Sequence, residues 1–265
     1  LWKAEPLEEF DYDAFNSQRF TDAIVERERA MDISRVRYPN DTTYEGKVLR
    51  VRQQYFFCSA SLQDIVANYI KQHGRDLRGL SDFNAIQLNY THPVLAIPEL
   101  MRILLDNYGM GWEEAWEVVT KTFAYTNHTV LAEALETWEM GIFDRIFPRI
   151  AEIVREIDRR FRLYMAERGL DQGTIDYLAP VSGGRAHMAW IACYASYSIN
   201  GVAALHTEIL KRDTLAQWYA IWPERFNNKT NGVTPRRWLK QCNPRLAALL
   251  DEVTGSDEWV KDLSV

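Results

Sequence analysis

Three short polar segments, each set after an apolar stretch, carry the side chains that could do chemistry. They are residues 88–93 (L-N-Y-T-H-P), 125–129 (Y-T-N-H-T) and 228–238 (N-K-T-N-G-V-T-P-R-R-W). Each segment combines side-chain amides and hydroxyls with an imidazole or a guanidinium. An imidazole and a carboxamide each offer a hydrogen-bond donor and an acceptor, as a sugar hydroxyl demands. The segments therefore outline a site for the hydroxyls and phosphate of a sugar.

The first two segments follow candidate β-strands. Residues 85–88 and 122–125 are short apolar stretches, and each leads through a polar turn into a helical pattern. This repeated order predicts right-handed βαβ units and a mostly parallel sheet, which binds ligands outside the carboxyl ends of its strands. The nearly continuous apolar run at 186–197 predicts a further strand near Ile191, buried on both faces. The expected fold class is therefore α/β.

Helical patterns fill most of the remaining chain. The longest runs from Lys47 to about His73 and ends at Gly74, a usual stop at a helix C-terminus. Further helices are predicted at 15–31, 94–107, 112–121, 143–163 and 202–212, with short helices after residue 238. The chain is thus expected to contain more helix than strand.

The composition narrows the class of protein. A chain of 265 residues with 47% apolar residues can bury a core in one large or two small domains. Its net charge of −6 argues against nucleic acid and against an anionic membrane as partners. No apolar run approaches the roughly 20 residues that cross a bilayer. Neither a membrane nor a nucleic acid is therefore expected as a partner.

The three cysteines do not form a recognisable pattern. Cys58, Cys193 and Cys242 are far apart and odd in number, which favours neither a disulfide framework nor a redox motif and suits a reducing cytoplasm. No spacing of His and Cys predicts a metal site, and no G-x-S-x-G turn exposes a nucleophilic serine. The polar segments remain the best candidates for function.

These segments resemble those of the α-glucan phosphorylases, the glycogen, starch and maltodextrin phosphorylase family. The family strings typically read L-N-D-T-H-P, Y-T-N-H-T-V-L-P-E-A-L and N-x-T-N-G-I-T-P-R-R-W. Further matches occur along the whole chain, at residues 1–2, 38–41, 99–100, 200–203, 206 and 242–244. The resemblance implies a pyridoxal-phosphate-dependent transferase, typically a homodimer, that releases glucose 1-phosphate from the ends of α-1,4-glucan with inorganic phosphate.

The resemblance also implies a domain organisation. Family members are several times longer than this chain and have a two-domain glycosyltransferase fold of the GT-B type. Residues 1–238 would form the C-terminal portion of the sugar-binding N-terminal domain, with a partial Rossmann-like fold. Residues 239–265 would form the crossover and the start of the cofactor-binding domain. The lysine that holds pyridoxal phosphate would lie outside this chain, so no catalytic residue is expected within it.

Three residues take a sugar-binding role from the resemblance. His128 matches the family histidine that bonds the glucose primary hydroxyl, and Asn231 matches the asparagine that shares this hydroxyl. His92 matches a histidine that lines the channel near the scissile bond. Without the family, a lone histidine near an apolar segment is more often a structural residue.

Three further residues take their roles only from the resemblance. Asp41 and Thr42 match the mobile gate loop over the active site, where the residues alone predict no more than a turn. Trp238 matches a tryptophan that lies near the cofactor.

The chain departs from the family pattern at several positions. Tyr90 stands where the family normally has aspartate, close to the sugar subsites, which implies an altered acceptor subsite or a shifted loop. It favours the alternative hypothesis, a non-catalytic carbohydrate-binding or structural module with the same fold. Ala132 and Ala195 replace a usual Pro and Gly without touching a proposed sugar contact.

Two expectations concern regulation and assembly. Residues 67–68 are Ala-Asn where some regulated relatives carry an arginine pair for a nucleotide phosphate, so no such allosteric site is expected. Without the upstream half of the domain, the sheet is expected to have an open edge that favours pairing with a second copy.

Overall fold

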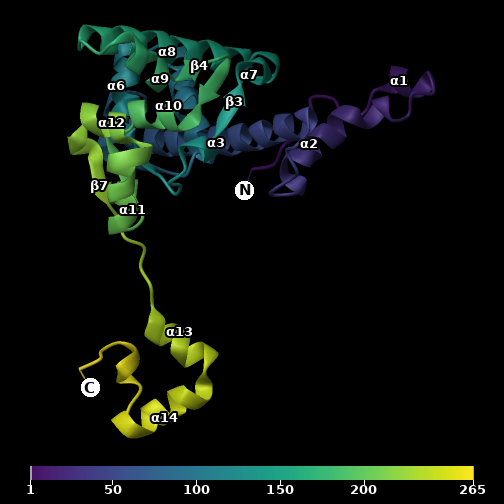
Figure 1. Cartoon of the computed structure of the whole chain (residues 1–265). Coiled ribbons are helices and arrows are strands. Elements are labelled where there is room, and N and C mark those ends of the chain that lie inside the picture. Colours follow the sequence, from purple (N-terminus) through teal and green to yellow (C-terminus); the bar gives the residue numbers. More distant parts are fainter. Residues whose placement is uncertain (1, 265) are drawn as a thin grey trace. The chain divides into compact units, whose positions relative to one another are not determined.

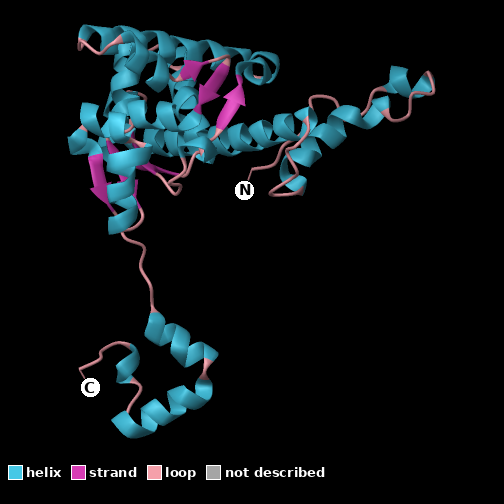
Figure 2. Cartoon of the chain, in the orientation of Figure 1, coloured by secondary structure: helices cyan, strands magenta, loops and turns pink. Residues whose placement is uncertain are grey.

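The chain forms two compact units. The structure, a computed structural model, describes residues 2–264, and its units are Leu1–Asn228, here the core unit, and Lys229–Val265, here the C-terminal unit. Figure 1 labels their elements and Figure 2 shows that helix predominates over strand. The fold is a helix-rich α/β fold with a mostly parallel sheet, as the sequence predicts.

The main sheet of the core unit has four parallel strands. They lie in the order β1-β2-β6-β7, with the bounds β1 (Ile86–Asn89), β2 (Phe123–Thr126), β6 (Ser198–Gly201) and β7 (Phe226–Asn228). The residues of β2 are all buried. Because the strands are parallel, their carboxyl ends meet at one edge, and this edge carries two of the three polar segments and the first residue of the third, Asn228. The predicted strands near Ile86 and Phe123 are thereby confirmed.

A second, smaller sheet is antiparallel. Its strands are β3 (Thr137–Glu139), β4 (Val181–Ser182) and β5 (Arg185–His187), in the order β3-β5-β4. Gly183 and Gly184 form the turn between β4 and β5. Their φ angles are 57° and 72°, positive values that glycine adopts without steric cost. The sequence analysis did not predict this sheet.

Helices cover most of the remaining core unit. Their bounds are α1 (Tyr12–Asn16), α2 (Val25–Arg35), α3 (Tyr44–His73), α4 (Leu80–Phe83), α5 (Ala96–Arg102), α6 (Trp112–Thr122), α7 (Met140–Ile146), α8 (Pro148–Glu167), α9 (Gln172–Leu178), α10 (Met188–Ala195), α11 (Ala204–Ile209) and α12 (Ala216–Ile221). Helix α3 begins after Thr43, whose side chain accepts a hydrogen bond from the Gly46 N–H, and ends before Gly74 at φ 89°. The predicted stop at Gly74 is confirmed.

The predicted strand near Ile191 is wrong. Residues 188–195 form helix α10, and all of them are buried. A helix that is apolar on every side is one surrounded by the core, and a short apolar run does not distinguish such a helix from a buried strand. The strand that joins the sheet follows it at Ser198–Gly201.

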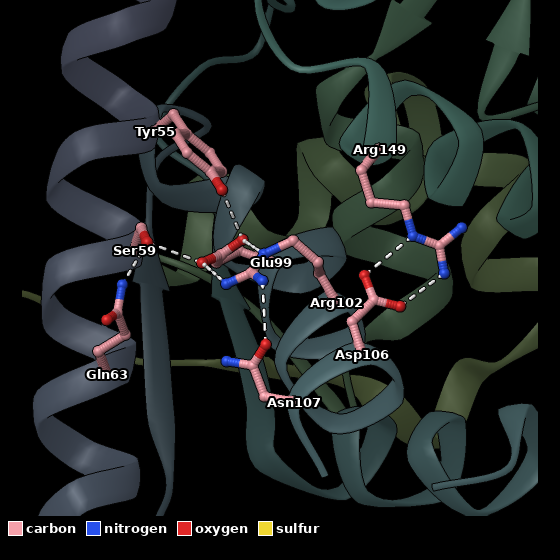
Figure 3. Close-up of polar contacts among 8 residues, drawn as sticks. All are labelled: Tyr55, Ser59, Gln63, Glu99, Arg102, Asp106, Asn107 and Arg149. Atoms are coloured by element: carbon pink, nitrogen blue, oxygen red, sulfur yellow. Dashed lines mark hydrogen bonds and ion pairs between the residues drawn. The ribbon is translucent and has the colours of Figure 1, made fainter. Parts of the chain in front are cut away.

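A buried carboxylate joins α3 to α5 (Figure 3). Glu99 is fully buried and accepts hydrogen bonds from Tyr55 Oη at 2.8 Å, from Ser59 Oγ at 2.7 Å and from Arg102 Nε and Nη2 at 2.7 and 2.9 Å. A buried charge is tolerated when it is paired and fully hydrogen-bonded. The network fixes the orientation of α3, the helix that also carries residues toward the polar sheet edge.

The C-terminal unit is a small helical assembly. It contains α13 (Pro235–Cys242) and α14 (Pro244–Thr254). Trp259 is its main buried residue, and its Nε1 donates to Asp251 Oδ1 at 2.7 Å. The Arg236 side chain donates to the carbonyls of Val260 and Lys261 at 3.0 and 3.1 Å. These contacts hold α13 and α14 to the chain that follows them.

Candidate functional site

The end of the main sheet brings two of the predicted segments together. The ladder between β1 and β2 ends with Asn89 opposite Thr126. One residue further, the Tyr90 N–H donates to the Thr126 carbonyl at 3.0 Å, and the Asn127 N–H donates to the Asn200 carbonyl at 3.0 Å. The register therefore places the turn after β1 beside the turn after β2.

The two turns are joined by a hydrogen bond between side chains. His128 Nε2 bonds to Asn89 Oδ1. The amide oxygen can only accept, so His128 Nε2 carries the proton and its Nδ1 is left as an acceptor. His128 is exposed, and within residues 2–264 its ring has no second hydrogen-bond partner. The pair therefore presents an acceptor, Nδ1 of the neutral His128 ring, to a hydroxyl.

A buried amide fixes the turn that carries His128. Asn127 is fully buried, its Nδ2 donates to Tyr125 Oη at 3.1 Å, and its Oδ1 accepts from the Thr129 N–H at 2.8 Å. The apolar environment of Tyr125 raises the pKa of its phenol, which keeps the hydroxyl protonated. The hydrogen bonds of Asn127 therefore join the turn that carries His128 to the buried strand before it.

His92 lies in a cluster of charged side chains. Its Nε2 is 3.4 Å from Arg50 Nη2 and 3.8 Å from Glu136 Oε1. Because a guanidinium only donates, Nε2 accepts, and the proton of the neutral ring is on Nδ1. Burial is the largest cause that lowers the pKa of His92, and the Arg50 charge adds to it, whereas Glu136 and Asp41 act in the opposite direction. Burial therefore favours a neutral His92 in spite of the neighbouring carboxylates.

Three side chains of this cluster were missed by the sequence analysis. Arg50 and Gln54 stand four residues apart on α3, and Gln54 Nε2 donates to Glu136 Oε1 at 2.9 Å. The spacing of two buried polar residues on an apolar helix face is a signal that could have revealed the first two. Glu136 comes soon after residues 125–129 in the sequence, but only the fold brings it to α3.

Several polar atoms at this cluster have no partner. Gln54 Oε1, Thr91 Oγ1 and Glu136 Oε2 are buried, and none of them has a hydrogen-bond partner in the part of the chain that the structure describes. Buried polar atoms are rarely left unpaired in folded proteins. Their gathering around His92 marks a place where a polar ligand or water would complete the hydrogen bonds.

A hollow of about 780 Å³ opens beside these residues. Its lining comes from α3, the segment before it and the turn after β1, and includes Arg37, Tyr38, Arg50, Gln54, Asn89, Tyr90 and His92. The Arg50 guanidinium lies 5.3 Å from the centre of the Tyr38 ring. This volume falls in the range of small-molecule pockets. The hollow is therefore large enough for more than one sugar unit.

The ring of Tyr90 lies near those of both histidines. The centre of its ring is 5.0 Å from that of His92, with the planes at 90°, and 6.3 Å from that of His128. Its backbone has a φ of 73°, in the left-handed region. The residue that departs from the family pattern thus lies close to both predicted sugar-binding histidines.

The proposed gate residues lie just before α3. Thr42 donates from both its N–H and its Oγ1 to Asn40 Oδ1, at 2.9 and 2.8 Å, so this segment is a local turn. Asp41 is exposed and close enough to His92 for its charge to act on the His92 pKa. The structure thus brings Asp41 toward the His92 cluster, whereas the contacts of Thr42 are local.

The third polar segment belongs mainly to the C-terminal unit. Asn231 and Trp238 are both exposed there, and Trp238 lies on α13. Their position relative to His128 stays a prediction. Among residues 2–264, no cluster of His, Cys, Asp and Glu could hold a metal ion, and no helix is both long and apolar enough to span a membrane.

Comparison with known proteins places the chain in a family. The family model described as carbohydrate phosphorylase matches residues 1–265. The chain is 45% identical to glycogen phosphorylase 2 of Dictyostelium discoideum and 44% identical to the H isozyme of α-glucan phosphorylase of Triticum aestivum, each over 100% of this chain. It is 43% identical to the cytosolic α-glucan phosphorylase 2 of Arabidopsis thaliana, again over 100% of this chain. The chain spans 27%, 33% and 33% of these relatives. The chain, which spans about a third or less of the length of these relatives, belongs to the carbohydrate phosphorylase family.

Proposed function

We propose that this chain is the sugar-side part of an α-glucan phosphorylase. The whole protein would transfer a terminal α-1,4-linked glucosyl unit to inorganic phosphate, giving glucose 1-phosphate. The observation that carries the proposal is the hydrogen-bonded pair of His128 and Asn89, which stands at the carboxyl ends of two parallel strands. The printed names of the relatives, glycogen phosphorylase and α-glucan phosphorylase, support the same reaction.

The residues of this chain would bind and orient the sugar. His128 Nδ1 would accept a hydrogen bond from the primary hydroxyl of glucose, and Asn231 would share that hydroxyl. Neutral His92 would donate from Nδ1 to a sugar oxygen near the scissile bond. Asp41 and Thr42 would cover the site from the segment before α3. In the reaction the bond from glucose C1 to the glycosidic oxygen breaks, a bond from C1 to a phosphate oxygen forms, and a proton passes to the leaving oxygen.

The chain does not itself hold the cofactor that we propose for the whole protein, pyridoxal phosphate. A lysine that forms a Schiff base is usually desolvated in a pocket. Among the described residues that line the hollow there is no lysine. In the proposal, other parts of the whole protein supply the cofactor lysine and the cations that bind its phosphate, and Trp238 lies close to the cofactor.

The proposal includes a domain assignment and a setting. Residues 1–238 would be the C-terminal portion of a Rossmann-like, sugar-binding domain of a GT-B fold, and residues 239–265 the crossover and the start of the cofactor domain. The protein would be a cytoplasmic homodimer, in line with the relative that is named cytosolic. The alternative of a non-catalytic module rests on Tyr90 alone, and the names of the relatives do not favour it.

The test is phosphorolysis by the full-length protein that contains this chain. With maltoheptaose and inorganic phosphate it should form glucose 1-phosphate, whereas the isolated chain of 265 residues should form none and show no absorbance of a pyridoxal aldimine. A full-length protein that binds pyridoxal phosphate but forms no glucose 1-phosphate would contradict the proposed reaction. Activity of the isolated chain would contradict the assignment of this chain to the sugar side alone.

A further inference from the structure

We propose that Tyr90 is a glucan-contacting residue, whose ring serves as a platform for a glucosyl unit in the hollow. The inference rests on the proposed function for the identity of the ligand. It goes beyond that function because the family pattern has a short carboxylate at this position, which offers no ring. It is carried by the backbone of Tyr90, by the place of its ring and by the free hydroxyl of its side chain.

The backbone of Tyr90 is in an unfavourable conformation for its side chain. Among residues 2–264, only Gln18 and Tyr90 combine a side chain with a positive φ, of 63° and 73°. Asn and Asp tolerate this left-handed region far better than a bulky aromatic residue does. Such conformations are concentrated at functional sites, where the surrounding structure imposes them. The tyrosine is thus present at a cost that an aspartate or asparagine would not have.

The surrounding structure fixes this conformation from both sides. The Tyr90 N–H donates to the Thr126 carbonyl at 3.0 Å, which ties it to the end of β2. Thr91 is buried, and Pro93 accepts a hydrogen bond from the Cys58 thiol of α3 at 3.4 Å. The register of the sheet therefore continues up to Tyr90. Of the two explanations for the tyrosine, an altered subsite is favoured over a shifted loop.

The ring is placed to contact a ligand. It is partly buried, lines the hollow, and stands perpendicular to the His92 ring, which supports it from one side. No described residue within hydrogen-bonding distance pairs with its hydroxyl, so the side chain is not held by a polar bond within the fold. A partly exposed ring beside hydrogen-bonding groups suits a sugar, which has an apolar C–H face and a rim of hydroxyls.

Three variants of the full-length protein separate the ring from the backbone. Tyr90→Asn removes the ring and relieves the strained φ, Tyr90→Ala removes the ring and keeps most of the strain, and Tyr90→Phe keeps both the ring and the strain. Gln18→Asn is the matched control, because it relieves the other positive φ at an exposed residue outside the hollow. The Kd for maltoheptaose is measured by calorimetry, together with the KM values for maltoheptaose and phosphate and the melting temperature.

If the ring is a platform, Tyr90→Asn and Tyr90→Ala should both weaken maltoheptaose binding by about threefold to tenfold. The KM for phosphate should stay unchanged, and Tyr90→Phe should restore most of the affinity. Tyr90→Asn should melt at a higher temperature than Tyr90→Ala, and Gln18→Asn should gain stability without any change in Kd.

Two results would overturn the inference. Tyr90→Asn and Tyr90→Ala that bind maltoheptaose as tightly as the wild type would show that the ring contacts no sugar. A wild-type protein that does not bind maltoheptaose would exclude the ligand itself. A wild-type protein that binds maltoheptaose without forming glucose 1-phosphate would contradict the proposed reaction only, and the comparison of Kd values would still decide the role of Tyr90.

Discussion

His128 Nε2 and Asn89 Oδ1 are hydrogen-bonded across the ends of two neighbouring parallel strands, although the two residues are 39 positions apart in the sequence. The bond fixes the tautomer of the His128 ring, because the amide oxygen cannot donate. It thereby directs an acceptor, Nδ1, toward any hydroxyl that approaches the exposed side of His128. This arrangement supports the sugar-binding role that we propose for His128.

The first prediction concerns the two proposed partners of the glucose primary hydroxyl. In the full-length protein, His128→Ala and Asn231→Ala should each lower kcat/KM for phosphorolysis of maltoheptaose by roughly tenfold to a hundredfold. A lost hydrogen bond in a closed pocket contributes on the order of 1–3 kcal/mol. Steady-state kinetics check this. Both variants at wild-type kcat/KM would mean that these residues have only a structural role.

The second prediction tests the positioning role of Asn89. Asn89→Ala should lower kcat/KM by less than His128→Ala does, because it leaves the ring present but frees its tautomer. The double variant should lose no more than His128→Ala alone, since residues that act through one another are not additive. The exposed Gln63→Ala, on the outer part of α3, is the control. Fully additive losses would separate the two residues and contradict the pairing.

The third prediction concerns the stability of the α3–α5 contact. Glu99→Ala should lower the free energy of unfolding by about 3–5 kcal/mol, because it leaves the partly buried Arg102 guanidinium without its carboxylate and two hydroxyls without their acceptor. Equilibrium urea unfolding measures this. Glu117→Ala, which removes an exposed ion pair with Lys121, should unfold like the wild type. Equal stability of the two variants would show that the network does not anchor α3.

The fourth prediction is a loss of stability in alkali. Burial, and then the Glu99 charge, raise the pKa of Tyr55 to about 12 from its usual value of 10. Between pH 10 and about pH 12, Tyr55 keeps its proton in the folded state and loses it in the unfolded state. The stability that neutral Tyr55 contributes is therefore complete below pH 10 and falls as the pH rises from about 10 to about 12.

The comparison that isolates this effect uses Tyr55→Phe. The variant loses one hydrogen bond and should be less stable than the wild type at pH 8. The difference in melting temperature between the two proteins should shrink as the pH rises past 10. A difference that stays constant up to pH 11 would mean that Tyr55 does not titrate as its buried contact with Glu99 requires.

The sequence predicted the parts of the fold whose pattern is local. The long helix with its stop at Gly74 and the strands near Ile86 and Phe123 were all marked by periodicity and by turn residues. The strand predicted near Ile191 became α10, because a helix surrounded by the core has no polar face to show its period. The strands β3 to β5 have only two or three residues each, too few for their alternation to distinguish them from loops.

Only part of the candidate site could be predicted from the sequence. His92, Tyr90 and His128 stand in motifs, and the register of the parallel strands brings these motifs together. Arg50 and Glu136 are 86 positions apart and meet at His92 only through packing of α3 against the turn after β1. No local sequence pattern predicts a contact between residues so far apart in the chain. The burial that lowers the pKa of His92, and the opposed charges of Glu136 and Arg50 beside it, could therefore be recognised only in the structure.

The most direct test of the central claim is a crystal structure of the full-length protein with a bound maltooligosaccharide. The terminal glucose is expected beside the hollow, with its primary hydroxyl within hydrogen-bonding distance of His128 Nδ1 and of the Asn231 side chain, and a sugar ring against Tyr90. A saccharide bound elsewhere, with His128 and Asn231 both free of sugar contacts, would contradict it.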